Sequence, residues 1–256
     1  MGNDPFWSLD GLRSTGVESS FFNPGFCLSL IVINHSAIRV SIDLPKVYPI
    51  TDTQLSGLSQ AEQVARLIEG GATLIQLRDK QAAPREFYRD ALAALEFARD
   101  HQARLIINDR VDIALALKAD GVHLGQTDMP VAAARRLLGK DAIIGFSTHN
   151  IEQARRAFDL PVDYLAFGPI FQTSTKQNPD PITGLEALRE LGMIKGSLPL
   201  VAIGGITLKN AVEALRSGAD TVALIAELVA DSRKIAENMS KILMFTSVLP
   251  NSASLS

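Results

Sequence analysis

The chain has 256 residues, 46 % of them hydrophobic, which is enough to bury a sizeable core in one α/β domain or in two small ones. Its net charge of −3 and isoelectric point near 5.8 exclude a broad basic field, so neither nucleic acid nor an anionic membrane is an expected partner. The single cysteine, Cys27, excludes an internal disulfide framework and predicts a reducing, cytoplasmic environment.

The first 44 residues differ from the rest of the chain. They are rich in Ser, Asn, Gly and Phe and show no sustained period, so we expect an irregular extension that carries no chemistry. Their apolar run, residues 26–33, is shorter than the roughly 20 residues of a membrane helix. The segment before that run has three acidic residues and only one arginine, so an export signal is not expected.

From Lys46 onward, strand-like and helix-like segments alternate. The strand-like segments are short, continuous apolar runs, which is the pattern of strands buried on both faces of a parallel sheet. The predicted strands are residues 47–51, 73–78, 104–108, 121–124, 142–147, 164–170, 200–204 and 221–225.

Between these strands, hydrophobic residues recur at helical spacing. The spacing predicts four buried helix faces: Ala61, Val64, Ala65 and Ile68; Phe87, Ala91, Ala94, Leu95 and Ala98; Ile151, Ala154, Ala157 and Phe158; and Leu208, Ala211, Val212 and Leu215. Pro84 suits a first helical turn and Thr207 an N-cap, while Gly70, Gly71 and Gly218 suit helix ends.

Eight strands alternating with eight helices predict a single (β/α)₈ TIM barrel, an α/β fold, over residues 45–244. Residues 1–44 would precede the barrel, and a tail of residues 245–256 would follow it. An open, doubly wound sheet is the alternative. It is disfavoured because no Gly-x-Gly-x-x-Gly follows the first strand.

Polar residues collect where the second strand ends, and in a barrel such ends share the rim that carries the active site. Gln76, Arg78 and Lys80 alternate along an extended chain, so they are expected to point the same way. Arg offers a bidentate fork for phosphate, Lys a point charge, and Gln an amide that can read a heteroaromatic edge. The alternative is a structural ion pair between Arg78 and Asp79.

Two carboxylates follow the next two strands. Asp109 comes after Asn108 at the end of the third strand, and Asp128 follows the fourth. On neighbouring loops they could hold one hard cation such as Mg²⁺, which typically takes one or two carboxylates together with phosphate oxygens and water. Each could instead be the N-cap of the helix that follows it.

The fifth strand ends in Ser147, which could donate a hydrogen bond to phosphate. Asn150 is expected to cap the next helix, and His149 is either a general acid or a solvated loop residue. His123, inside the fourth strand, is expected to be a packed, hydrogen-bonded residue and not a proton shuttle.

The last three strands predict anion contacts. After the sixth strand, a loop brings Thr173, Thr175 and Lys176, which suit clustered negative oxygens, although a solvated surface loop is the alternative. Gly204-Gly205 after the seventh strand, with the helix start after the eighth, suits a phosphate cup. A simple tight turn is the alternative there.

Together these segments resemble the thiamine-phosphate synthase family over about residues 47–243. Six motifs occur in the order of that family: Gln-Leu-Arg-x-Lys, Asn-Asp-Arg, His-Leu-Gly-Gln-x-Asp, Ser-Thr-His-Asn, Gly-Pro-Ile-Phe-x-Thr-x-Thr-Lys and Ile-Gly-Gly-Ile. The resemblance implies a transferase that joins 4-amino-2-methyl-5-(diphosphooxymethyl)pyrimidine to thiazole phosphate, carboxylated or not. The products would be thiamine phosphate and diphosphate.

The resemblance also implies a role for each matching residue. The pyrimidine diphosphate would contact Gln76, Arg78, Lys80, Asn108, Ser147 and Lys176, of which Arg78, Lys80, Ser147 and Lys176 would act in catalysis; Mg²⁺ would be held by Asp109 and Asp128; and the thiazole phosphate would contact Thr173, Thr175, Gly205, Ile225 and Ala226. The family often has Ser where this chain has Ala226, which removes one hydroxyl.

The expected partners are these small molecules, and a homo-oligomer is left open. Two rival functions share the fold: a thiazole tautomerase, which needs proton transfer and has no use for the metal carboxylates, and a non-catalytic sensor of phosphate ligands. The joint presence of Asp109, Asp128 and Lys176 argues against both.

Overall fold

The computed structural model describes residues 42–173 and 180–247, all of which fall in one compact unit, residues 37–256. The expected extension up to residue 41, the tail from residue 248, and Thr175 and Lys176 therefore lie outside the described residues. In the described part, no helix has both the length and the apolar character needed to cross a membrane.

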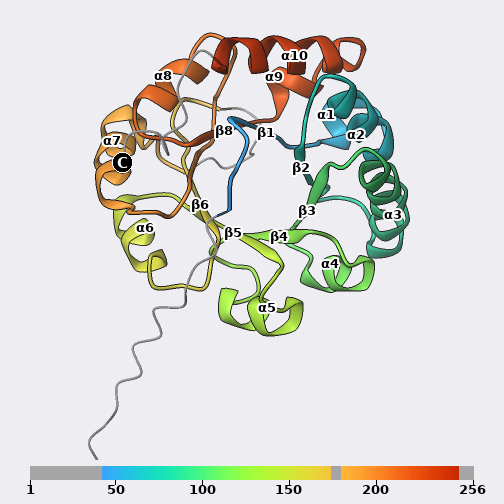
Figure 1. Ribbon diagram of the computed structural model, residues 1–256, viewed down its shortest axis with the longest axis horizontal. Helices are drawn as coiled ribbons and strands as arrows, with labels where there is room; N and C mark the ends of the chain where they lie inside the picture. Colours follow the sequence, from blue (N-terminus) through green and yellow to red (C-terminus); the bar gives the residue numbers. More distant parts are fainter. Residues whose placement is uncertain (1–41, 174–179, 248–256) are drawn as a thin grey trace, which may run out of the picture. The chain divides into compact units, whose positions relative to one another are not determined.

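Eight parallel strands form the centre of the molecule, with helices around them (Figure 1). The strands are β1 (Val47–Pro49), β2 (Leu74–Leu77), β3 (Arg104–Asn108), β4 (Gly121–Leu124), β5 (Ile143–Thr148), β6 (Tyr164–Phe167), β7 (Leu200–Ala202) and β8 (Thr221–Leu224). From β2 to β8 each strand pairs with the next, and β8 pairs with β1. Between β1 and β2, a parallel bridge joins Ile50 to Gln76, and Thr51 N donates to Gln76 O at 2.9 Å.

This order confirms the predicted (β/α)₈ barrel, and every predicted strand is present. Several end earlier than expected. The sixth stops at Phe167, shortly before Pro169, since proline has no N–H for the ladder.

Helices in the described part lie outside the strands in chain order (Figure 1). They are α1 (Thr53–Ser56), α2 (Gln60–Glu69), α3 (Pro84–Asp100), α4 (Val111–Leu117), α5 (Val131–Leu138), α6 (Ile151–Ala157), α7 (Gly184–Ile194), α8 (Ala211–Arg216), α9 (Ala226–Val229) and α10 (Ile235–Thr246), with a 3₁₀ turn at Ser232–Lys234. Pro84 opens α3 as predicted, and the five predicted face residues of α3 are its buried residues.

Two details of the helices differ from the prediction. Helix α2 buries Gln60 and Gln63 together with Val64 and Leu67, while the predicted Ala61 and Ile68 are partly buried and pack against the core. Both glutamines are buried because they hydrogen-bond to the loops beside β1, for example from Asp52 N to Gln63 Oε1 at 3.0 Å.

The second correction concerns Thr207. Helix α8 begins only at Ala211, with Asn210 in the cap position. Asn210 accepts a hydrogen bond from Thr207 N at 2.7 Å, so Thr207 opens a turn before the helix and does not cap it.

Hydrophobic side chains form two clusters because alternate strand residues point to opposite faces. One lies between strands and helices. The other fills the barrel interior with Tyr48, Leu74, Ile106, Tyr164 and Val201 among its members. Ile42 and Leu44, just before β1, pack against this inner cluster.

We therefore predict that deleting residues 2–40 leaves stability and activity nearly unchanged, because Ile42 and Leu44 remain. Deleting residues 2–44 exposes part of the inner cluster, at a cost of about 2 kcal/mol. For a chain of this size the melting temperature should then fall by about 4–8 °C. Thermal unfolding of both deletions beside the full chain tests this; a large loss in the shorter deletion contradicts it.

Candidate active site

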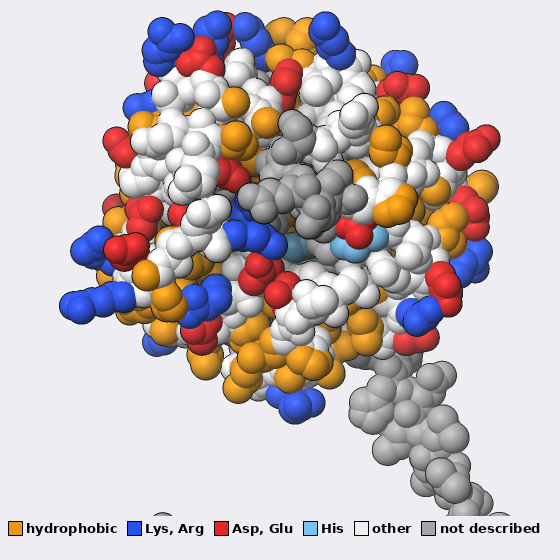
Figure 2. All heavy atoms as spheres, turned by 180° about the vertical axis from the view of Figure 1, so that it is seen from behind, with side chains coloured by type: hydrophobic (Ala, Val, Ile, Leu, Met, Phe, Trp, Pro, Cys, Tyr) orange, Lys and Arg blue, Asp and Glu red, His pale blue; other side chains and the backbone are white. Residues whose placement is uncertain are grey.

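A cavity of about 820 Å³ opens at the carboxyl ends of the strands. Every strand or the loop after it contributes to the lining, through residues that include Ile50, Gln76, Asn108, His123, Ser147, Gly168, Gly204 and Ile225. Basic, acidic and histidine side chains gather at the centre of this face of the molecule (Figure 2). A cavity of this size suits a small organic ligand.

The structure brings most of the predicted site residues together. Those lining the cavity are Gln76, Arg78, Lys80, Asn108, Asp109, Asp128, Ser147, Thr173 and Ile225. Gly204 lines it as well, whereas its neighbour Gly205 is not among the lining residues. Gly204 has φ of +94°, and a Cβ there would lie 2.5 Å from Pro169 Cα, so only glycine fits this turn. Ala226 is exposed at the start of α9.

Arg78 is held by a residue that the sequence prediction missed. Its Nη1 donates to Asp52 Oδ2 at 2.8 Å, and both side chains are mostly buried. Asp52 also caps α1, because it accepts hydrogen bonds from Gln54 N and Leu55 N. Asp79, the alternative partner of Arg78, instead accepts from Thr53 Oγ1 at 2.5 Å. The available signal was the polar Thr51-Asp52-Thr53 directly after the first strand.

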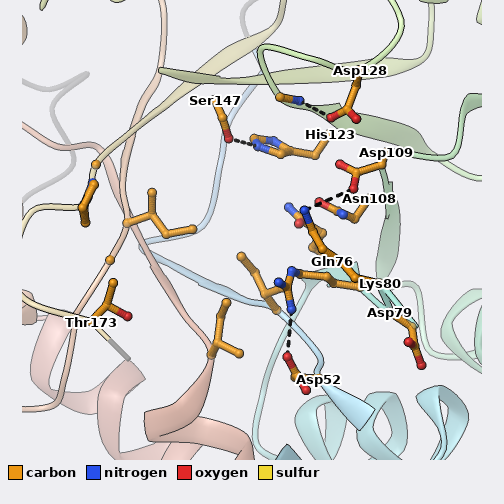
Figure 3. A pocket seen from close by; sticks show the side chains of 18 of the residues that line it. Asp52, Gln76, Asp79, Lys80, Asn108, Asp109, His123, Asp128, Ser147 and Thr173 are labelled. Carbon is orange, nitrogen blue, oxygen red and sulfur yellow. Dashed lines mark hydrogen bonds and ion pairs between the residues drawn. The ribbon is translucent and has the colours of Figure 1, made fainter. Parts of the chain in front are cut away.

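The two carboxylates face the same part of the cavity, with the Lys80 ammonium beside them (Figure 3). Lys80 Nζ lies 3.5 Å from Asp109 Oδ2. Burial raises the pKa of Asp109 above its ordinary value, Lys80 opposes that shift, and the neighbouring Asp128 raises it further. A partly buried carboxylate next to a second carboxylate is therefore stabilised by any cation that enters.

Neither aspartate serves as the helix cap that was its alternative. The N-cap position of α4 is Arg110 and that of α5 is Pro130. Asp109 has φ of +61°, and Asp128 Oδ2 accepts from Gly125 N at 2.7 Å, which closes its own loop.

Asp109 and Asp128 offer two carboxylates, which suit a hard cation that takes its other ligands from water and substrate. Among the described residues, no group of three or more His, Cys, Asp or Glu is arranged to hold a metal through the protein alone. Two carboxylates are what Mg²⁺ typically takes from a protein, because its other ligands are water and phosphate oxygens.

The predicted packing of His123 is confirmed. Its Nδ1 lies 2.9 Å from Tyr164 Oη and its Nε2 lies 2.8 Å from Ser147 Oγ. Burial lowers the pKa of His123 from 6.5 to about 4, against the opposing effect of Asp128. This imidazole is therefore neutral at physiological pH.

His149 lies at the cavity rim and is held there, so it is not a freely solvated residue. Its Nδ1 is 2.9 Å from Gly168 O and 3.5 Å from Asp180 Oδ2. Asn150 caps α6 as predicted, because its Oδ1 accepts from Gln153 N at 2.9 Å.

Known proteins agree with this architecture. A family model described as thiamine monophosphate synthase matches residues 47–228. A thiamine-phosphate synthase of Albidiferax ferrireducens is 46 % identical over 192 residues, which is 75 % of this chain and 87 % of that protein. One from Clostridium novyi is 45 % identical over 185 residues, 72 % of this chain and 90 % of that protein.

Solved structures give the same result. Thiamine phosphate pyrophosphorylase from Pyrococcus furiosus superposes with a TM-score of 0.72 at 36 % identity, covering 79 % of this chain and 96 % of that one. Phosphoribosyl anthranilate isomerase from Thermotoga maritima, at 12 % identity and a TM-score of 0.58, shares the barrel fold alone.

The burial of His123 predicts how stability depends on pH. Its folded pKa of about 4 lies below the ordinary 6.5, so the unfolded chain takes up the proton first. This contribution to stability is complete above pH 6.5 and declines as the pH falls toward 4, by about 3 kcal/mol in total. Urea unfolding from pH 7 to pH 4 should show this loss in the wild type relative to His123→Gln. Parallel curves for the two proteins would contradict it.

Proposed function

The chain belongs to the thiamine monophosphate synthase family, a family of transferases in thiamine biosynthesis, and we propose a specific reaction for its cavity. It joins 4-amino-2-methyl-5-(diphosphooxymethyl)pyrimidine to thiazole phosphate, carboxylated or not, and releases diphosphate, together with CO₂ when the thiazole carries the carboxylate. The observation that carries this proposal is that one cavity gathers Asp109, Asp128, Arg78 and Lys80 next to neutral amide and hydroxyl groups.

The pyrimidine diphosphate would take the side of the cavity formed by β2 to β5. The amides of Gln76 and Asn108 suit the donor and acceptor edge of an aminopyrimidine. Arg78 and Lys80 suit the diphosphate because one offers a bidentate fork and the other a point charge. Ser147 would add a hydroxyl donor, and Lys176, outside the described residues, would complete this set.

Asp109 and Asp128 would hold Mg²⁺, consistent with their position on one side of the cavity beside Lys80. A bound Mg²⁺ would neutralise charge on a diphosphate leaving group.

The proposed chemistry needs charge stabilisation rather than a protein nucleophile. The bond between the pyrimidine methylene carbon and the diphosphate oxygen breaks, and its electron pair leaves with diphosphate. The electron-rich aminopyrimidine delocalises the positive charge left on that carbon. Arg78 and Lys80 stabilise the departing oxygens without transferring a proton. The thiazole nitrogen then forms the new C–N bond with its lone pair.

The thiazole phosphate would take the side formed by β6 to β8. Thr173 and Ile225 line the cavity there, and Gly204 leads into the turn that includes Gly205. Thr175 lies outside the described residues, and Ala226 opens α9. Fixing the phosphate holds the thiazole nitrogen near the reacting carbon, which converts the second step into an effectively intramolecular one.

The cytoplasmic location stays a prediction.

We predict that Asp109→Ala and Lys176→Ala each reduce turnover by at least about 100-fold. The first removes a proposed ligand of Mg²⁺ and the second removes a cation, and both the metal ion and the cation would stabilise the leaving diphosphate. The matched controls are Asp112→Ala and Lys140→Ala, at exposed positions. Purified proteins are incubated with both phosphorylated precursors and Mg²⁺, and thiamine phosphate and diphosphate are measured. Near-normal turnover in either site variant, with the fold intact by circular dichroism, would remove this mechanism.

We also predict that Ala226→Ser lowers the KM for thiazole phosphate about two- to tenfold, because it adds one hydroxyl donor to the proposed phosphate site. The kcat should change little, since the reacting atoms are not contacted. Ala230→Ser, at the other end of α9, is the matched control. Steady-state kinetics with the pyrimidine diphosphate saturating measures both constants, and an unchanged KM rejects this placement of the phosphate.

A further inference from the structure

Five polar side chains form a continuous hydrogen-bonded chain across the barrel interior. Gln76 Nε2 donates to Tyr48 Oη at 3.1 Å, and Tyr48 Oη lies 3.0 Å from Tyr164 Oη. Tyr164 Oη lies 2.9 Å from His123 Nδ1, and His123 Nε2 lies 2.8 Å from Ser147 Oγ. Five different strands supply these residues. Its two ends, Gln76 and Ser147, both line the cavity, while both tyrosines are fully buried.

Distances alone do not fix the donors of the last three bonds, but the amide at one end sets their direction when each hydroxyl donates within this series of residues. The Gln76 NH₂ group can only donate, so Tyr48 Oη accepts and its own proton goes to Tyr164 Oη. Tyr164 must then donate to His123 Nδ1, which places the imidazole proton on Nε2. That proton is donated to Ser147 Oγ, which leaves the serine proton for a partner in the cavity.

We propose that this chain is a positioning device in which all donors run from Gln76 to Ser147, so that Ser147 presents its hydroxyl proton to an oxyanion of the bound ligand. Tyr48, Tyr164 and His123 are positioning residues that act through the two ends. Only the identity of the oxyanion, a diphosphate oxygen, rests on the proposed function.

The chain consists of neutral groups, as this direction requires. Burial raises the pKa of both Tyr48 and Tyr164, so their hydroxyls keep their protons. Burial also keeps His123 unprotonated, and a neutral imidazole has one donor and one acceptor nitrogen. A charged imidazole would donate from both nitrogens and would break the single direction.

Packing holds the middle of the chain in place. The rings of His123 and Tyr164 stack with centroids 5.5 Å apart. Both approach the backbone of Gly145 on β5, where an added Cβ would lie 2.1 Å from Tyr164 Cζ and 2.5 Å from His123 Nδ1. Gly145 thus leaves the space that brings the two rings together.

A consequence is that Gln76 and Ser147, the two ends of the hydrogen-bonded series, are coupled. Turning the Gln76 amide over would present its oxygen to Tyr48 and would reverse every donor as far as Ser147. Gln76 then could not change the group that it shows to a ligand without changing Ser147 from donor to acceptor. The orientation of the Gln76 amide and the donor role of the Ser147 hydroxyl therefore change only together.

The direction is measured by the tautomer of His123 in the full chain without ligand. Nitrogen-15 NMR of histidine-labelled protein at pH 7.5 distinguishes the two ring nitrogens, and the His123 signals are those missing in His123→Gln. The expected result is the Nε2–H tautomer. The Nδ1–H tautomer would overturn the proposal, and the tautomer itself is read in the wild-type protein.

The ligand-facing end is tested with Tyr164→Phe, which removes the donor to His123 Nδ1. We expect a mixture of His123 tautomers and about tenfold weaker binding of inorganic diphosphate with Mg²⁺ by calorimetry. Tyr88→Phe, on the outer helix α3, is the matched control and should match the wild type. A single unchanged tautomer, or unchanged diphosphate affinity, in Tyr164→Phe would overturn the proposal.

The outcome is separable from that of the proposed function. Suppose that the protein makes no thiamine phosphate, but His123 is the Nε2–H tautomer and Tyr164→Phe binds diphosphate more weakly. The proposed reaction is then wrong and the positioning role of these residues stands. If it makes thiamine phosphate with the opposite tautomer, the reaction stands and the chain direction is wrong.

Discussion

Closure of eight parallel strands is the constraint on which the rest of this molecule depends. The barrel is completed between β1 and β2 by the bridge from Ile50 to Gln76 and by one backbone hydrogen bond beside it. Since every strand then runs the same way, every carboxyl end meets at one rim. Residues more than 170 positions apart, such as Ile50 and Ile225, line the same cavity for this reason alone.

The alternation of side chains along each strand places core residues and site residues on the same inner face, at different heights in the barrel. Leu74, Ile106 and Ile143 belong to the inner hydrophobic cluster. Two residues further along β2 and β3 come Gln76 and Asn108, and four further along β5 comes Ser147, all of which line the cavity. One strand thus supplies both the core and the site. Every buried side-chain nitrogen or oxygen in the described part has a hydrogen-bond partner, which offsets the cost of burying this polar layer.

The fold and most of the cavity lining could be predicted from sequence because they follow from local patterns. Apolar runs mark the strands, and polar residues just after them mark the rim. The partners of these residues could not be predicted the same way. Tyr48 and Tyr164 are 116 positions apart and read as ordinary apolar strand residues, yet their hydroxyls meet at 3.0 Å. Asp52 is likewise 26 positions from Arg78. No period in the sequence encodes such pairs.

The site combines neutral hydrogen-bonding groups with charged side chains. The hydrogen-bonded residues from Gln76 to Ser147 are neutral and buried except at the Ser147 end, so their hydrogen bonds act over short distances and are little weakened by salt. Lys80 and Asp109 are more exposed, with side chains that are 56 % and 28 % accessible. The Lys80 ammonium at this rim attracts an anion from a distance but fixes it poorly by itself, because water screens the charge. A ligand that carries both a flat polar ring and clustered negative oxygens satisfies the two parts at once, and a ligand that carries only one of these features leaves the other part without its partner.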